Sequence, residues 1–117
     1  MKILKTLNSI LNQGEFTRHE RNLIAKAYNF SEKAHKGQFI DSKRKVSFFN
    51  HPAYAGYFLA KWGQNAEAVA AGLLHDIVED CGIKLFEINR KFGKKVAFYV
   101  DGMSWFRRKI HGKMKKD

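Results

Sequence analysis

Apolar residues recur every three or four positions along most of the chain, and this spacing places them on one face of an α-helix. The first segment shows it clearly, because Ile3, Leu4, Leu7, Ile10 and Leu11 form a single stripe. The pattern as a whole predicts helices over residues 2–12, 17–34, 51–63, 66–80, 84–92 and 94–105.

Local signals mark several of these helix ends. Thr17-Arg18-His19-Glu20 has the form of a capping box at the start of the second helix. Pro52 suits the first turn of the third helix and Gly63 its end, while Asn65 can cap the fourth. Residues 38–50 form a polar, basic stretch that we interpret as a loop. The sequence therefore predicts an all-α bundle of about five to six helices.

Length and composition limit the class of protein further. A chain of 117 residues suits one small domain, here 1–117, with a single core. The single cysteine, Cys81, excludes a disulfide framework and a CxxC zinc site. The run Val96 to Val100 could form a strand, but no other segment offers it a partner. No signal peptide is indicated, and no apolar stretch approaches the ~20 residues of a membrane span, so we expect a cytoplasmic protein.

The formal net charge of +11 is the next strong feature of the chain. Much of it lies in the tail 107–117, which carries six Lys and Arg residues against one Asp. A basic body suits a polyanionic partner, and a small-molecule nucleotide is the partner we expect. Nucleic acid fits the charge equally well, since charge alone does not distinguish the two.

One segment, Gly72 to Asp80, combines a histidine with three carboxylates among apolar residues. On a continuous helix His75, Asp76, Glu79 and Asp80 fall within an arc of about 140°. No Lys or Arg lies between Gln64 and Gly82 to relieve the repulsion of these acids, so a bound cation is the favoured interpretation. Gly72 lies inside the same arc, where the missing side chain is expected to leave room for something bound.

A second histidine is predicted to approach this segment. His51 begins the third helix and His75 lies late in the fourth, and two antiparallel helices joined by a short turn at residues 63–64 would bring them together. His35, near the end of the second helix, stays open between a core residue and a ligand. His19 and His111 have the character of ordinary surface residues.

With these residues in place, the chain resembles the hydrolase domain of RelA/SpoT homologues, a family of HD-domain enzymes. Members of the family remove the 3′-pyrophosphate from the alarmones ppGpp and pppGpp, usually with manganese. The resemblance runs from about residue 24 to 105 in the family's order and is carried by the blocks Ala34-His35-Lys36-Gly37-Gln38, Phe48-Phe49-Asn50-His51-Pro52, Leu73-Leu74-His75-Asp76-Ile77-Val78-Glu79-Asp80, and Phe92-Gly93 to Val100-Asp101-Gly102.

The resemblance implies an HD-domain helical bundle with a divalent metal, Mn²⁺, bound by His51, His75 and Asp76. It also implies that Glu79 and Asp80 position or activate the attacking water. The residue types agree with this chemistry, because imidazole and carboxylate ligands suit such an ion, and a metal lowers the pKa of coordinated water. A carboxylate one turn away can accept the water's proton.

The substrate is expected to meet the basic loop before the histidine block. Lys43, Arg44 and Lys45 can neutralise pyrophosphate oxygens, and an Arg can stack on guanine. This loop is longer than is usual in the family and lacks its Gly-Glu-Pro. The family's fourth metal ligand is an Asp in a later block resembling ADRLHN, and the present sequence stops at Asp117 before one. We therefore expect an impaired site with slow or absent turnover, which a homo-oligomer could complete.

Three alternatives accompany this interpretation. The substrate could be another phosphorylated nucleotide such as NADPH. The domain could instead be catalytically silent and bind nucleotides or partner chains. A nucleic-acid binder using the basic tail ranks last, because the tail region offers only Trp105 and Phe106 for stacking on bases.

Overall fold

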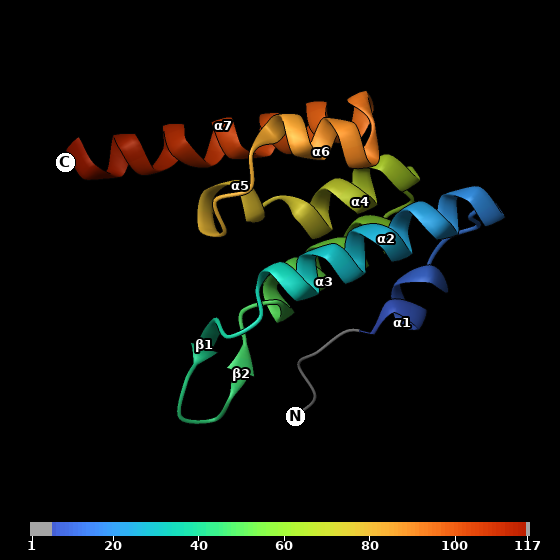
Figure 1. Cartoon of the computed structure of the whole chain (residues 1–117), viewed down its shortest axis with the longest axis horizontal. Helices are drawn as coiled ribbons and strands as arrows, with labels where there is room; N and C mark the ends of the chain where they lie inside the picture. Colours follow the sequence, from blue (N-terminus) through green and yellow to red (C-terminus); the bar gives the residue numbers. More distant parts are fainter. Residues whose placement is uncertain (1–5, 117) are drawn as a thin grey trace.

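A computed structural model describes the backbone of residues 6–116 and the side chains of residues 6–105 and 109. The predicted all-α class is confirmed: helices dominate, and one small hairpin interrupts them (Figure 1). The elements in chain order are α1 Leu7–Leu11, α2 Arg18–Ala34, β1 Phe39–Asp41, β2 Val46–Ser47, α3 Asn50–Lys61, α4 Ala66–Leu74, α5 Ile77–Asp80, α6 Leu85–Phe92 and α7 Lys94–Lys116. No described helix combines the length and the apolarity needed to cross a bilayer.

The predicted helix starts are mostly confirmed because their caps are local. Thr17 and Glu20 form the capping box of α2, with Glu20 Oε1 accepting the Thr17 backbone N–H at 2.8 Å. Asn65 caps α4 by accepting the backbone N–H of Ala68 at 2.8 Å. The first helix is shorter than predicted: α1 begins at Leu7 behind the cap Thr6, and residues 1–5 lie outside the described part.

The prediction of a loop over residues 38–50 is wrong, because a β-hairpin lies within it. Strands β1 and β2 pair antiparallel, with Phe39 opposite Ser47 and an irregularity before Asp41. Asp41 Oδ1 accepts the backbone N–H groups of Lys43 and Arg44 at 3.1 and 3.3 Å, which folds the tip into a turn. Lys45 adopts the left-handed conformation with φ 58°. A lysine thus takes the left-handed position that Asn-Gly or Asp-Gly usually fills in tight hairpin turns, so the sequence signal typical of such a hairpin is missing.

Helix α4 lies at the centre of the bundle, with α2, α3 and α7 packed against it. Its small residues allow this close approach, and it is buried almost throughout. One glycine on each helix allows α3 and α4 to approach closely. A Cβ on Gly56 of α3 would lie 2.7 Å from Leu73 Cδ2, and a Cβ on Gly72 of α4 would lie 2.4 Å from Leu59 Cδ1. Leu59 thus occupies the position that a Gly72 side chain would take, so the missing side chain serves helix packing, while Gly72 also lines a cavity beside His75 and a bound group there stays a prediction.

The predicted helix 66–80 is broken into two. Residues 75 and 76 form a turn between α4 and α5, and Asp76 has φ −92° and ψ −11°, in the sparsely populated bridge region. His75 Nδ1 lies 2.5 Å from the carbonyl oxygen of Gly72. In the last turn of α4 this carbonyl oxygen therefore bonds to a side chain. The acids Glu79 and Asp80 therefore lie on a separate short helix, after the turn that contains His75.

The last helix is longer than the predicted 94–105. Helix α7 continues to Lys116, so the backbone of the basic tail is helical. Figure 1 shows α7 in orange and red, packed beside α6 in its first half and extending past α5 in its second. Val96 and Val100, which could have begun and ended a strand, are buried within α7. Among the described side chains of α7, those that join the core lie in its N-terminal half.

Candidate metal centre

Three predicted ligands, His51, His75 and Asp76, lie together at the junction of α3, α4 and α5. One ligand atom from each lies within 4.8 Å of the others, the only such group of three His, Cys, Asp or Glu residues in the described part of the chain. His51 Nε2 is 3.4 Å and His75 Nε2 is 3.2 Å from the same oxygen, Oδ2 of Asp76. The antiparallel arrangement of α3 and α4 brings the two histidines together, as their positions predicted.

The tautomer of His75 follows from its backbone contact. The carbonyl oxygen of Gly72 can only accept a hydrogen bond, so the ring nitrogen Nδ1 of His75, 2.5 Å away, carries a proton and donates it. In the neutral ring the lone pair then lies on Nε2, which faces Asp76 Oδ2. A histidine that donates one N–H to a carbonyl and offers its other nitrogen is the usual arrangement of a metal ligand.

The charge arrangement of this cluster fits a cation. Two imidazole nitrogens and one carboxylate oxygen converge, and acceptor lone pairs this close repel each other unless a proton or a metal lies between them. The Asp76 side chain is only 5% exposed, whereas that of His51 is 56% exposed. The cluster therefore has a buried anionic side and a solvent-facing side through which a ligand could approach. Nitrogen and oxygen donors in this combination suit a divalent transition metal.

The predicted acids Glu79 and Asp80 lie on the short helix α5, directly after the cluster. The hydroxyl group of Ser104, on α7, donates a hydrogen bond to Glu79 Oε1. Ser104 is buried, whereas Glu79 reaches the surface. The backbone N–H of Asp80 donates to the carbonyl oxygen of Asp76 at 2.8 Å. Helix α5 therefore begins directly after a cluster residue and is joined to α7 through Glu79.

The predicted substrate residues Lys43, Arg44 and Lys45 lie at the tip of the hairpin, which projects from the bundle near the start of α3 (Figure 1). All three are exposed, and Arg44 Nε lies 3.8 Å from Asp41 Oδ2. Lys45 Nζ lies over the ring of Phe39, 5.6 Å from its centroid. The structure does not place these cations within the His51, His75 and Asp76 cluster.

Sequence reasoning missed two partners of the site. Ser104 carries no motif of its own, and its contact with Glu79 spans 25 positions of the chain. Gln38 donates from Nε2 to the Asp80 carbonyl oxygen at 3.3 Å, and its only sequence signal was membership of the block with His35. Both residues act on α5 from distant elements, which no helical periodicity could reveal.

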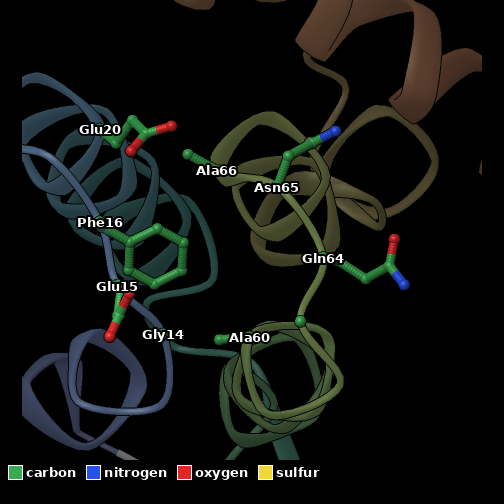
Figure 2. Close-up of a pocket in the computed structure, with 9 residues that line it drawn as sticks. Gly14, Glu15, Phe16, Glu20, Ala60, Gln64, Asn65 and Ala66 are labelled. Carbon is green, nitrogen blue, oxygen red and sulfur yellow. The ribbon is translucent and has the colours of Figure 1, made fainter.

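Two cavities are candidate positions for a bound group. One of about 320 Å³ adjoins the cluster through His75, and its lining is mostly apolar: Ala55, Phe58, Leu59, Trp62, Gly72 and Met103. Another of about 210 Å³ lies between the α1–α2 connection and the α3–α4 turn (Figure 2). The carboxylate of Glu20 borders this second cavity but is already engaged in the α2 capping box. The second cavity therefore offers no comparable ligand set.

Comparison with known proteins identifies the family of this chain. The family described as HD domain matches residues 27–115. The chain belongs to the HD domain family. Proteins named guanosine-3′,5′-bis(diphosphate) 3′-pyrophosphohydrolase from Spiroplasma citri and Borreliella burgdorferi are each 36% identical to it, over 81 and 92 residues. A protein named GTP pyrophosphokinase from Streptomyces coelicolor is 39% identical over 83 residues. These matches confirm the expected resemblance to RelA/SpoT homologues.

The matched regions cover most of this chain but little of each relative. They span 69%, 79% and 69% of the chain, in that order, and 10%, 13% and 9% of the three relatives. The similarity therefore concerns one domain of much longer proteins.

Proposed function

We propose that this domain hydrolyses the 3′-pyrophosphate of ppGpp with a divalent ion, preferably Mn²⁺, bound by His51, His75 and Asp76. The observation that carries the proposal is the convergence of two imidazole nitrogens on one buried carboxylate oxygen, at 3.4 and 3.2 Å. The names of the relatives from Spiroplasma citri and Borreliella burgdorferi support the choice of substrate.

Each member of the cluster has a separate role in this proposal. The Gly72 carbonyl oxygen fixes the ring of His75 so that Nε2 is presented. Asp76 supplies the negative charge, and the exposed side of His51 leaves access for a phosphorylated ligand. When bound, the ion supplies a Lewis acid that polarises phosphoryl oxygens and acidifies water.

The carboxylates of Glu79 and Asp80 act on the proton of the attacking water. In the reaction a water oxygen forms a bond to the nearer phosphorus of the 3′-pyrophosphate, the bond between that phosphorus and the ribose 3′-oxygen breaks, and the 3′-oxygen takes up a proton to leave as a hydroxyl group. The products are GDP and pyrophosphate. Glu79, oriented by Ser104, holds the water and accepts its proton. Asp80 adds a second negative charge on the same short helix.

The hairpin tip provides the positive charge that the substrate requires. Lys43, Arg44 and Lys45 are exposed on the hairpin, which projects from the bundle beside the start of α3, the helix that carries His51 (Figure 1). Ammonium and guanidinium groups pair with phosphate oxygens through charge-assisted hydrogen bonds. The Arg44 interaction with Asp41 is long, at 3.8 Å, so exchanging it for a phosphate costs little.

Two measurements on the purified chain test the proposal. After treatment with a chelator, Mn²⁺ should raise the melting temperature, because an ion that binds only the folded state stabilises it by mass action. His75→Ala and Asp76→Asn should abolish most of this shift, and His19→Ala, which changes an exposed histidine of α2, should not. With Mn²⁺ present, pyrophosphate should be released from ppGpp only slowly, as expected for an impaired site with three protein ligands, and Glu79→Gln should lower kcat about a further hundredfold.

The outcomes separate the alternatives. A His75→Ala variant that responds to Mn²⁺ as the parent does would overturn the ligand assignment. Mn²⁺ and ppGpp binding without pyrophosphate release would favour the silent binding domain, and release of phosphate from NADPH but not from ppGpp would favour the other substrate.

A further inference from the structure

His35 is a fully buried polar side chain that the proposed chemistry does not use. It follows α2, and its ring lies between the hairpin and the end of α5. Nδ1 lies 2.9 Å from Gln38 Oε1 and 3.5 Å from Cys81 Sγ. Among the described residues Nε2 has no hydrogen-bond partner. The orientation of the His35 ring is therefore defined, because rotating the ring would break the hydrogen bond at Nδ1 and leave both ring nitrogens without a partner.

The direction of the hydrogen bonds fixes the tautomer of His35. Gln38 Nε2 donates to the Asp80 carbonyl oxygen at 3.3 Å, so its amide oxygen faces His35. This oxygen can only accept, and His35 Nδ1 therefore donates to it. The result is a directed chain from His35 through Gln38 to the backbone of Asp80. Gln38 also accepts the backbone N–H of Phe48 at 2.8 Å, which ties the same residue to the hairpin.

A second path leads from the same ring to the metal cluster. The rings of His35 and Phe48 lie 5.2 Å apart between centroids, at an interplanar angle of 32°. Phe48 in turn meets His51 edge-on at 6.1 Å. The exposed His51 therefore has packing on one side from a ring that His35 supports. His35 thus reaches both halves of the site, the cluster through Phe48 and the acids through Gln38.

We propose that His35 is a positioning residue of the hydrolase site: it orients the His51 ring through Phe48 and holds the Asp80 end of α5 through Gln38. The inference rests on the proposed function, which assigns metal binding to the cluster and proton transfer to the acids of α5. The contacts of His35 with Phe48 and Gln38 are observed independently of that function. Partners that orient ligands and catalytic groups from behind typically contribute 10–100-fold to affinity or activity. The two paths predict separable effects.

Gln38→Met tests the path to the acids, because it keeps the side-chain length and removes both the donor and the acceptor. The backbone N–H groups of Asp80 and Cys81, which donate at 2.8 and 3.0 Å within α5, should exchange with solvent about tenfold faster. With ppGpp, kcat should fall about tenfold, while KM and Mn²⁺ affinity stay within twofold. The matched control is Gln64→Met, an exposed glutamine of the α3–α4 turn, which should leave all of these unchanged.

His35→Asn tests the path to the cluster, because the asparagine amide can still donate to Gln38 while the ring is lost. Mn²⁺ affinity should fall about tenfold, and exchange at Asp80 should stay near the parent value. His19→Asn is the control. If His35→Asn does not fold, Phe48→Leu removes the same ring contact from the half-buried neighbour and should weaken Mn²⁺ binding in the same way.

Failure of this proposal is distinguishable from failure of the proposed function. Folded variants with parent-like Mn²⁺ affinity and parent-like exchange at Asp80 and Cys81 would show that His35 and Gln38 only fill space, and would overturn the proposal. A parent that neither binds Mn²⁺ nor hydrolyses ppGpp would refute the proposed function instead. The exchange rates of α5 and the ring-proton shifts of His51, both measured without metal, would then still decide whether His35 positions these groups.

Discussion

The hydroxyl group of Ser104 donates a hydrogen bond to the carboxylate of Glu79, and this contact joins the centre of α7 to the short helix α5. Ser104 is buried, whereas Glu79 is exposed. A hydrogen bond to an ionised carboxylate is stronger than one between neutral groups. The contact therefore favours the orientation of Glu79 that points toward Ser104 on α7.

Ser104→Ala should lower kcat for ppGpp about tenfold and leave KM nearly unchanged, because the change loosens a proton-accepting group without touching the hairpin. The free energy of unfolding should fall by about 1 kcal/mol, since the exposed carboxylate recovers its hydrogen bond from water. Steady-state kinetics and urea denaturation measure the two effects. Ser42→Ala, at the exposed hairpin tip, is the control, and an unchanged kcat in Ser104→Ala would show that Glu79 needs no orienting partner.

Gly72→Ala should destabilise the fold, because the new methyl group would lie 2.4 Å from Leu59 Cδ1. Overpacking of this kind costs about 1–3 kcal/mol, against a gain in helix propensity of about 1 kcal/mol. Leu59→Ala makes room, so it should cost less in the Gly72→Ala background than in the parent. Thermal unfolding of the four proteins measures this coupling, and strictly additive costs would contradict the close contact.

Stability should fall at alkaline pH. Burial raises the pKa of Tyr28, with a further contribution from Glu32, and burial also raises the pKa of the Cys81 thiol. Each group therefore keeps its proton in the folded state at a pH where the unfolded chain has lost it, and stability falls as pH rises past the ordinary values of 9.0 for Cys81 and 10.0 for Tyr28. Guanidinium denaturation at pH 8 and pH 10.5 measures the decline.

The variants Tyr28→Phe and Cys81→Ala assign this alkaline loss to its sources. Each should reduce the difference in unfolding free energy between the two pH values, although Tyr28→Phe also removes a buried hydroxyl and lowers stability at both. A pH dependence identical to that of the parent in both variants would assign the loss to other groups.

Nucleotide binding should depend on the hairpin tip and on salt. Replacing Lys43 and Arg44 with Gln should weaken ppGpp more than GMP, because ppGpp carries more phosphate charge. The effect should shrink at high salt, since exposed charges are screened within about 8 Å at physiological ionic strength. Calorimetry at two salt concentrations measures it. Tighter binding of random duplex DNA than of ppGpp would make nucleic acid the better candidate partner.

Local signals made much of the helical framework predictable. The capping box at Thr17, the cap at Asn65 and the glycine after α3 act within a few residues, so the sequence alone identifies them. The hairpin was missed because its turn depends on the Asp41 side chain and on a lysine with positive φ. Nothing in the composition of residues 38–50 distinguishes such a turn from an irregular loop.

The candidate site likewise has features that the sequence alone predicts and others that depend on tertiary packing. The proximity of His51, His75 and Asp76 was predictable, because antiparallel neighbours joined by a short turn must lie side by side. Their role as ligands stays a prediction. The break between α4 and α5 was not predictable, because it involves a ring nitrogen bonding to the Gly72 carbonyl. The partnership of Ser104 with Glu79 depends on how α7 packs, which requires the complete tertiary structure.

The location of the cluster has a consequence for the order in which the molecule assembles. His51 lies in α3, and His75 and Asp76 lie in the turn that follows α4. The three residues thus come from one helical hairpin and the turn after it, and we expect contacts between segments this close in sequence to form early in folding. Glu79 acquires its partner only when α7 docks, since Ser104 lies on that later helix. We therefore expect His51, His75 and Asp76 to come together before Ser104 reaches Glu79, so that an ion bound by these three residues would favour completion of the fold.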